Sequence, residues 1–342
     1  MAAIQVATHG GVEVLQEATV PVPRPGPDEA LVRVRACGVN HLDVWVRRGV
    51  PGHVFPLPLI PGSDIAGTID QLGRPHSHFR TGDRVAVSPG VSCGTCLACL
   101  SGRDPFCKSY AILGEHRDGG CAEYVVVPVS NLLRLSDNLT FENAAAIPLV
   151  FLTAWHMLVD RCQITAGEFV LVHAGGSGVG SAAIQIAKLW GARVMTTVGS
   201  TAKIARAKEL GADHVINYNQ KDFFVEVKKA TAGVGANIVV DHVGVDTFDR
   251  SLRSLAPGGR LVTCGATSGN EITVDLRRVF YKSLSILGST MGGKGELSRL
   301  WDFFGSEKLR PVVHKVLHMK HIRKAHQMLE DRKVFGKVIV VP

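Results

Sequence analysis

Four cysteines in short succession are the side chains of this sequence that are best suited to chemistry. Their spacing, C-x2-C-x2-C-x7-C, lets one loop place four thiolates around a tetrahedral metal ion. A closed cage of four cysteines is typical of structural zinc, whereas catalytic zinc keeps one position open for water or substrate. We therefore predict one structural zinc ion per chain, in a lobe of about residues 90–120, and an iron–sulfur cluster is the main alternative. The predicted ligands are Cys93, Cys96, Cys99 and Cys107.

A glycine-rich turn between an apolar strand and a helix is the second chemical motif. The strand Phe169–His173 leads into the turn Ala174–Gly180 and then into the helical stretch Ser181–Lys188. Glycines bring the backbone close to phosphate groups, and the first N–H groups of a helix favour negative charge. Ser177 stands where the pattern G-x-G-x-x-G has its middle glycine, and a purely structural turn is the alternative interpretation. The predicted dinucleotide contacts are Gly175, Gly176, Ser177, Gly178, Val179 and Gly180.

The stretch after the next strand favours a phosphorylated dinucleotide. An NAD site usually has Asp or Glu about twenty residues after the glycine loop, where it binds the ribose hydroxyls. Here the stretch Val198–Lys203 contains no acid and supplies the hydroxyl of Ser200 and the ammonium of Lys203. We therefore predict NADP(H), with NAD(H) as the alternative.

Length and composition describe a globular chain of about two domains, because 46% of its 342 residues are hydrophobic. The other four cysteines are scattered singly, as in proteins of reducing compartments. The N-terminus lacks the regions of a signal peptide, and no uninterrupted apolar run reaches the length of about eighteen residues that a membrane span needs. We predict a cytoplasmic protein with no membrane partner.

The formal net charge of +8 and the pI near 9.1 raise the question of nucleic-acid binding. Such binding would require Lys and Arg to gather on a patch or an arm. The densest stretch, Lys315–Lys337, instead mixes its basic residues with apolar and acidic ones, as on a solvated helix face. The positive charge equally suits capture of a polyanionic nucleotide, so a nucleic-acid partner is the less favoured interpretation.

The chain has two parts that differ in their predicted secondary structure. In its first third, short β-rich runs such as Ala30–Ala36 and Asp64–Ile69 alternate with glycine and proline turns, which predicts an irregular β domain. From about Thr140, apolar strands alternate with amphipathic helices, as in the parallel β-α-β units of a doubly wound sheet. The fold class is therefore α/β, and a final strand, Gly336–Val341, is a candidate to complete the first domain. Predicted strands of the second part are 169–173, 193–198, 214–216, 238–242 and 260–264.

The chain resembles the medium-chain dehydrogenase/reductase superfamily over essentially its whole length. Besides the cysteines and the glycine loop, the match rests on the segments Cys37–Asp43, Pro61–Gly67, Gly82–Val85, Ala207–Ala212, Asp241–Gly244 and Gly336–Val340. The resemblance implies a GroES-like catalytic domain made of residues 1–148 and 291–342, and a Rossmann domain of residues 149–290. It also implies an active-site cleft where the domains meet, and a homodimer or homotetramer.

Zinc alcohol dehydrogenases of this superfamily bind a second, catalytic zinc through three motif positions that have other residues here. Asn40 stands where the first cysteine belongs, Ser63 replaces the histidine, and residues 147–155 contain no cysteine. Because a Lewis-acid zinc needs three protein ligands, we expect no catalytic zinc. The alternative is a rebuilt site that uses His41, Glu115 or His116.

The Asn40 pattern and the segment Phe151–Trp155 are similar to the quinone oxidoreductase branch, which works without a catalytic metal. In that branch, residues that match Ser200, Lys203 and Tyr218 surround the 2′-phosphate. Thr153 matches a residue beside the nicotinamide, and the predicted cofactor contacts also include Gly265 and Lys337. The four-cysteine lobe departs from this branch, because many quinone oxidoreductases lack it.

Without zinc, the chemistry that fits best is hydride addition to a conjugated acceptor. Reduction of a simple aldehyde concentrates charge on one oxygen, whereas a quinone, enal or enone spreads the charge, so hydrogen-bond donors and a solvent proton suffice. We predict NADPH-dependent reduction of such small molecules. Asn40 would orient substrate or nicotinamide. His41 would either donate a proton or act as an orienting residue. Asp43 and Asp64 would hold neighbouring groups, and a structural role is the stronger interpretation for both.

Two other functions stay open on the sequence. The first is an alcohol dehydrogenase with a rebuilt catalytic zinc site. The second is a non-enzymatic protein that uses the nucleotide fold to bind a nucleotide or RNA.

Overall fold

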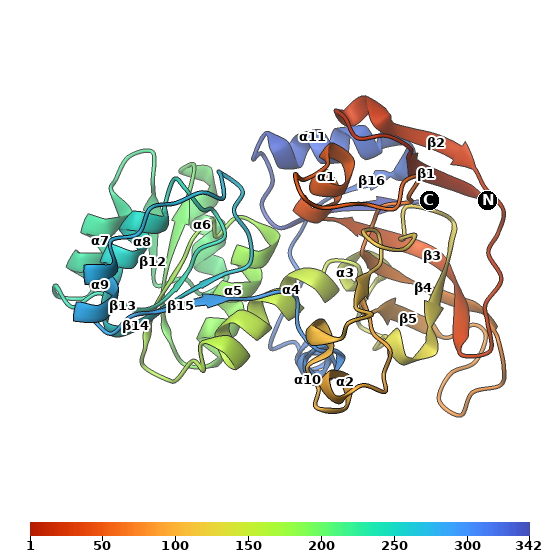
Figure 1. The fold of residues 1–342 in the computed structure, drawn as a ribbon, viewed down its shortest axis with the longest axis horizontal. Coiled ribbons are helices and arrows are strands. Elements are labelled where there is room, and N and C mark those ends of the chain that lie inside the picture. Colours follow the sequence, from red (N-terminus) through yellow and green to blue (C-terminus); the bar gives the residue numbers. More distant parts are fainter. The chain divides into compact units, whose positions relative to one another are not determined.

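The computed structural model describes all 342 residues. They form two compact units, one made of Met1–Leu149 with Gly293–Pro342 and the other of Val150–Gly292. Figure 1 shows both termini in the first unit, where segments from the two ends of the sequence form neighbouring strands.

The second unit is built on a six-stranded parallel sheet. Its strand order, β12-β11-β10-β13-β14-β15, is that of a doubly wound dinucleotide-binding fold, which confirms the predicted α/β class. The strands are β10 (Phe169–Val172), β11 (Arg193–Val198), β12 (His214–Asn217), β13 (Ala236–Val240), β14 (Leu255–Thr263) and β15 (Ser285–Gly288). The helices are α5 (Gly178–Leu189), α6 (Ala202–Glu209), α7 (Phe223–Ala230), α8 (Phe248–Ser254) and α9 (Leu276–Tyr281).

The central strands of this sheet are buried on both faces, because helices cover both sides. Val170, Leu171 and Val172 of β10 are fully buried, as the uninterrupted apolar run in the sequence indicates. Helix α5 packs on β10 and β11, and α8 packs on β13 and β14. The five strands predicted for this part are therefore confirmed, and β15 is an additional edge strand that the sequence analysis did not predict.

The first unit contains a seven-stranded sheet with two small two-stranded sheets. The main path is β16-β17-β3-β4-β5-β9, and β8 also pairs with β3. These strands are β16 (Val313–His318), β17 (Lys337–Val341), β3 (Glu29–Val39), β4 (Asp64–Leu72), β5 (Arg84–Val87), β9 (Leu132–Arg134) and β8 (Tyr124–Pro128). The small sheets pair β1 (Ala2–Val6) with β2 (Leu15–Thr19), and β6 (Gly90–Val91) with β7 (Ala111–Ile112).

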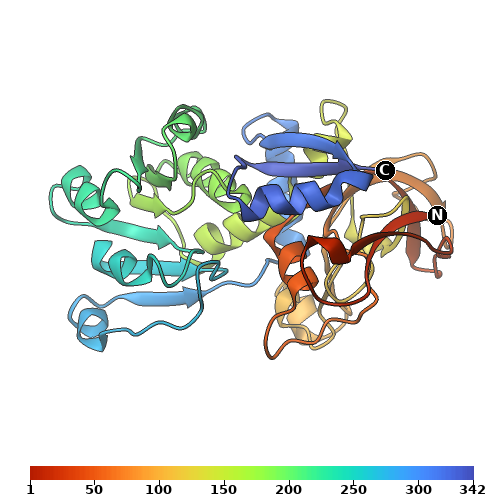
Figure 2. The ribbon, with the colours of Figure 1, turned by 90° about the horizontal axis from the view of Figure 1, so that it is seen from above.

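Short helices surround this sheet. In Figure 2 the dark blue helix α11 lies beside the last strands, and it packs on β16 and β17. The α-helices are α1 (His41–Arg48), α2 (Leu97–Leu100), α3 (Phe141–Ala144), α4 (Pro148–Trp155), which runs on into the second unit, α10 (Lys294–Gly305) and α11 (Ile322–Glu330). Further helical segments are η1 (Val12–Val14), η2 (Asp104–Phe106), η3 (Val129–Asn131), η5 (Met319–His321) and, in the second unit, the π-helix η4 (His156–Arg161).

The C-terminal strand β17 lies between β16 and the N-terminal strand β3. It pairs antiparallel with β3, with Val338 opposite Val39 and Val340 opposite Cys37. The predicted strand Gly336–Val341 is therefore confirmed, and it joins β16 to the five strands of this sheet that come from the first 140 residues.

One helical stretch, Phe141–Arg161, meets the length and composition of a membrane span. Of its most apolar window, 78% is buried inside the protein, and mostly buried core helices pass the same test.

Candidate active site and metal centre

The register of three neighbouring strands brings together residues from distant parts of the sequence. Strand β3 ends at Val39, opposite the start of β17, while Gly38 lies opposite Asp64 at the start of β4. Lys337, Asn40 and Asp64 therefore meet at one end of the sheet. Gly38 permits this close packing, because a Cβ at this position would lie 2.2 Å from the carbonyl oxygen of Ala145.

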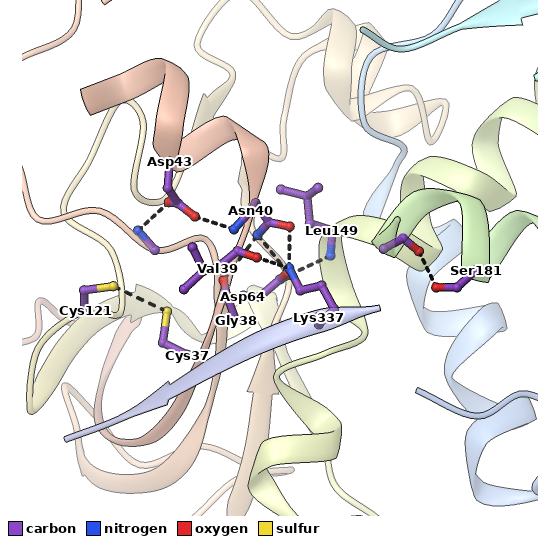
Figure 3. Close-up of polar contacts among 12 residues, drawn as sticks. Cys37, Gly38, Val39, Asn40, Asp43, Asp64, Cys121, Leu149, Ser181 and Lys337 are labelled. Carbon is purple, nitrogen blue, oxygen red and sulfur yellow. Dashed lines mark hydrogen bonds and ion pairs between the residues drawn. The ribbon is translucent and has the colours of Figure 1, made fainter. Parts of the chain in front are cut away.

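We call Lys337, Asn40 and Asp64 the buried lysine network, which is drawn in Figure 3. The Lys337 ammonium donates to Asp64 Oδ2 at 2.8 Å, to the carbonyl oxygen of Val39 at 3.0 Å and to Asn40 Oδ1. Asn40 Nδ2 donates to the same carboxylate oxygen of Asp64 at 2.9 Å, and the Leu149 amide donates to the other at 2.6 Å. The exposed fractions of Asp64, Lys337 and Asn40 are 0%, 3% and 5%.

This geometry gives every charge of the network a partner. An ammonium has three N–H donors, and the three acceptors of Lys337 use all of them. A buried carboxylate is tolerated only when it is paired and hydrogen-bonded, as Asp64 is here. The predicted cofactor contact of Lys337 stays a prediction, since its ammonium already has three acceptors within the protein.

Asp43 shapes the beginning of helix α1. Its Oδ2 accepts the backbone N–H of Asn40 at 2.6 Å, and its Oδ1 accepts that of Gly62 at 2.9 Å. With the Asn40 side chain this forms a capping box, a signal that fixes where α1 starts. Burial raises the pKa of Asp43 to about 6, although the two amides and Lys337 favour the carboxylate. These contacts favour the structural interpretation of Asp43.

His41 and Ser63 are the polar side chains here that the network does not use. His41 is the first residue of α1 and is partly exposed, and its ring lies edge-on to Trp45, with the ring centroids 5.3 Å apart. Burial lowers the pKa of His41, which favours the neutral imidazole near pH 7. Ser63 is fully buried and its hydroxyl has no hydrogen-bond partner in the protein.

The four cysteines of the lobe converge as predicted. The Sγ–Sγ distances are 3.8 Å for Cys93–Cys99, 3.5 Å for Cys96–Cys99 and 3.6 Å for Cys93–Cys107, and no cysteine forms a disulfide. Four sulfurs at zinc–sulfur bond length around one ion are about 3.8 Å apart, so the donor set and the spacing fit zinc.

The lobe is tied to helix α10. The carboxylate of Asp104 in η2 accepts the backbone N–H of Lys294 at 2.7 Å, at the first turn of α10. A metal held by the cysteines would thus order a segment that also contacts a distant part of the same unit.

A second group of metal-binding side chains lies in the first unit. Glu115 and His116 lie together, and their third member is His53 instead of the predicted His41. Sequence reasoning missed His53, because a single histidine in a loop has no spacing that predicts a partner.

Most of the predicted dinucleotide residues lie just after the carboxyl ends of the parallel strands, whereas Thr153 belongs to α4 and Lys337 to β17 of the first unit. Gly175 comes after β10, Ser200 after β11, Tyr218 after β12 and Gly265 after β14. In an open parallel sheet this edge is the ordinary ligand site.

Ser177 has a structural reason to replace the middle glycine of the motif. It is the N-cap of α5, and its hydroxyl oxygen accepts the N–H of Gly180 at 2.9 Å. The N–H groups of Gly178 and Val179 precede the intrahelical ladder and are available to an anion. A Cβ on Gly180 would lie 2.2 Å from the carbonyl oxygen of Ala174, so the turn requires glycine there. The loop fits a dinucleotide pyrophosphate.

The turn after β11 is basic and crowded. A Cβ on Gly199 would lie 2.4 Å from the hydroxyl of Tyr218, so glycine lets the tyrosine lie over this turn. Burial and the neighbouring Arg206 lower the pKa of Lys203, and both basic residues belong to α6, the helix that follows this turn. Thr153, the residue predicted beside the nicotinamide, is a buried residue of α4.

Sequence reasoning gave no role to the side chain of Asp241, which shapes the turn after β13. Its Oδ1 accepts the N–H groups of Val243 and Gly244 at 3.0 and 3.2 Å, and its Oδ2 accepts the hydroxyl of Ser251 at 2.7 Å. The buried His173 ring also contacts Ser251, and burial lowers the pKa of His173 to about 4. This cluster holds the nucleotide edge of the sheet in place.

A four-cysteine loop on a GroES-like β unit, together with a doubly wound sheet and a phosphate-binding helix start, defines a dinucleotide-dependent oxidoreductase. Residues 26–137 match the model of the alcohol dehydrogenase GroES-like domain, and residues 178–306 match that of the zinc-binding dehydrogenase. The chain belongs to the medium-chain dehydrogenase/reductase superfamily, which confirms the resemblance found in the sequence.

Three relatives illustrate the range of this superfamily. The chain is 30% identical to a quinone oxidoreductase of Homo sapiens over 349 residues, which cover 100% of this chain and 98% of the relative. It is 31% identical to an acryloyl-coenzyme A reductase of Sulfurisphaera tokodaii over 325 residues, which cover 94% and 95%. A solved structure described as an NAD-dependent alcohol dehydrogenase matches with a TM-score of 0.96 at 50% identity, over 100% of both chains. These matches support an enzyme and speak against the non-enzymatic alternative.

Replacement of the buried lysine should destabilise the protein strongly. Lys337→Met keeps the length of the side chain but leaves Asp64 as a buried carboxylate without its cation, so we expect the free energy of unfolding to fall by about 3–5 kcal/mol. Urea denaturation followed by circular dichroism measures this loss. The matched control is Lys315→Met, at an exposed position of the neighbouring strand β16. Equal stability of the two variants would contradict the network's role.

Proposed function

We propose that the protein is an NADPH-dependent reductase of quinones or activated enals and enones, and that it transfers hydride without a catalytic zinc at the usual position of the superfamily. The observation that carries this proposal is the buried lysine network. Asn40 and Ser63 stand at two motif positions of the catalytic zinc, and the carboxylate of Asp64 is already neutralised by Lys337. A divalent cation at this place would meet a fixed ammonium, and only one anionic side chain of the motif remains to bind it.

The chain's own residues suit a substrate that spreads its charge. NADPH, when bound, supplies the hydride, and reduction of a quinone or enone also takes up one proton. Solvent is the source of that proton, and we assign His41 to orient and relay it: as one nitrogen of the neutral, partly exposed imidazole gives up its proton, the other takes one from water. Asn40 acts as a positioning residue, since both ends of its amide are engaged in the network.

The preference for NADPH is supported by the turn after β11. No acid follows the strand, and the resemblance to quinone oxidoreductases assigns Ser200, Lys203 and Tyr218 to a 2′-phosphate. The pKa of Lys203 is lowered by burial and by Arg206, and a bound phosphate would offset both effects. Because the chain is also similar to a solved structure described as an NAD-dependent alcohol dehydrogenase, the preference for NADPH over NADH must be measured directly.

We further propose that the four cysteines hold one structural zinc ion per chain. Their sulfur spacing and the absence of disulfides support zinc, and the contact of the lobe with α10 supports a structural role.

A homodimer is proposed from the edge of the nucleotide unit. Strand β15 pairs only with β14, so its other side has unpaired backbone groups. Leu276, Phe280, Tyr281 and Ile286 on α9 and β15 are exposed by 70%, 61%, 80% and 43%, and exposed apolar side chains of this size are typical of interaction surfaces. A second copy that pairs through this edge would cover both features. A homotetramer would need a further interface, and the cytoplasmic location stays a prediction.

A second candidate function is an alcohol dehydrogenase with a rebuilt metal site. Two observations favour it. His53, Glu115 and His116 lie close enough together to share a metal ion, and the chain is similar to a solved structure described as an NAD-dependent alcohol dehydrogenase.

A panel of acceptors tests the proposed reaction. We expect purified protein to oxidise NADPH with 1,4-benzoquinone or a conjugated enone at least about tenfold faster than with a saturated aldehyde, because only the conjugated acceptors delocalise the charge. Turnover should survive prior incubation with a chelator that leaves the cysteine-bound zinc in place, as checked by elemental analysis. Alcohol oxidation that the chelator abolishes would favour the second candidate.

Removal of the lysine side chain that is proposed to bind the 2′-phosphate tests the preference for NADPH over NADH. Lys203→Ala should lower kcat/KM for NADPH by roughly 10- to 100-fold, the value of one lost charge-assisted hydrogen bond, and leave that for NADH nearly unchanged. Lys208→Ala, at an exposed position of the same helix, is the matched control. An equal loss with both coenzymes would argue against a 2′-phosphate contact.

A charged substitution on the edge strand β15 tests the proposed dimer interface. Ile286→Lys should shift the protein toward the monomer in analytical ultracentrifugation, since the lysine would be buried in the apolar contact. Val316→Lys changes an equally exposed valine on β16 and should have no such effect. A dimer unchanged by Ile286→Lys would place the interface elsewhere.

A further inference from the structure

The loop after α1 and the turn after β7 place His53, Glu115 and His116 together. We call these three residues the His-Glu-His cluster. His53 Nε2 lies 3.5 Å from Glu115 Oε1, and His116 Nδ1 lies 3.8 Å from Glu115 Oε2. One ligand atom of each residue lies within 4.8 Å of those of the other two. The two imidazoles therefore face the two oxygens of one carboxylate.

These distances fit a shared ion better than direct hydrogen bonds. A charge-assisted N–H···O bond is about 2.7–2.9 Å long, which is clearly shorter than either contact. Ligand atoms at zinc–nitrogen and zinc–oxygen bond lengths lie about 3.3–3.5 Å apart in a tetrahedron. Small side-chain movements would bring all three residues onto one ion.

The backbone of the turn holds two of the ligands in advance. The N–H groups of Glu115 and His116 both donate to the carbonyl oxygen of Ile112, at 3.2 and 2.9 Å. The third ligand is held by an aromatic contact, since the centroid of the His53 ring lies 4.4 Å from that of Phe55. The cluster is thus organised without a metal, which lowers the entropy lost on binding one.

The exposure of the cluster suits coordination. His116 Nδ1 faces Glu115 and accepts the N–H of Ile112 at 3.2 Å, so its single lone pair is engaged by the backbone, and a small rotation of the ring must release it before it binds an ion. The exposed fractions of the side chains are 39% for His53, 35% for His116 and 12% for Glu115. Solvent therefore reaches the imidazole side, where a water or another ligand would complete the coordination.

We propose that the His-Glu-His cluster binds one divalent transition-metal ion, such as Zn²⁺ or Co²⁺, and leaves coordination positions open. Two imidazoles and one carboxylate form a donor set that suits these borderline ions and disfavours Mg²⁺ and Ca²⁺, which prefer oxygen ligands. This proposal does not depend on the reaction proposed above.

The site is coupled to the segment that carries Ser63 and Asp64. A Cβ on Gly114, the residue before Glu115, would lie 2.6 Å from the backbone nitrogen of Gly62, so the two segments are in contact. The N–H of Gly62 in turn donates to Asp43. A metal on the cluster would therefore stiffen the backbone beside the buried lysine network.

Cobalt titration of the full-length, zinc-containing protein tests the proposal. We expect the wild-type protein to bind one Co²⁺ per chain in addition to its cysteine-bound zinc, with weak visible bands of nitrogen and oxygen coordination and without sulfur-to-cobalt charge transfer. Glu115→Gln and His53→Gln should each weaken this binding at least ~10-fold, because each removes one of three protein ligands.

The control is His76→Gln, which removes an exposed histidine of another loop and should leave Co²⁺ binding unchanged. Circular dichroism and retention of the cysteine-bound zinc would verify that each variant is folded. Absence of the additional Co²⁺ in the wild-type protein, or equal affinity in the wild type and both cluster variants, would overturn the proposal.

Discussion

The ion pair between Lys337 and Asp64 is the interaction on which the first unit depends. The two residues are 273 positions apart, and both are almost completely buried. A buried carboxylate and ammonium are each costly to remove from water, so each requires the other at hydrogen-bond distance. The pair therefore fixes how the C-terminal strand β17 meets β3 and β4, and Asn40 adds the hydrogen bonds that fill the remaining donor and acceptor positions.

The same pair is the basis of the chemistry that we propose. In the zinc alcohol dehydrogenases that the sequence resembles, a metal ion supplies positive charge near this place, whereas here the positive charge is the fixed ammonium of Lys337. Its three N–H groups already have protein acceptors, so it organises the site and does not polarise a substrate oxygen. In the function that we propose, charge that develops during reduction is therefore delocalised in the substrate itself, as in quinones and conjugated carbonyls.

The sequence predicted the elements whose signals are local. Strand β11 has the predicted bounds, because an unbroken β-forming run, 193–198, lies between two glycines. The convergence of the four cysteines was also predictable, since one loop carries them all. The partners of Lys337 were not, because they depend on an antiparallel register between the two chain ends. Helix α1 was missed as well: its capping box uses Asp43 at the third position, where the usual signal is Glu or Gln.

Anomalous diffraction at the zinc absorption edge, from a crystal of the full-length protein grown with zinc and NADPH, tests the central claim most directly. We expect an anomalous peak among the four cysteine sulfurs and none between Asn40, Ser63 and Asp64, with the Lys337 ammonium bonded to the Asp64 carboxylate. A zinc peak between those three side chains, with Lys337 displaced from Asp64, would contradict the central claim.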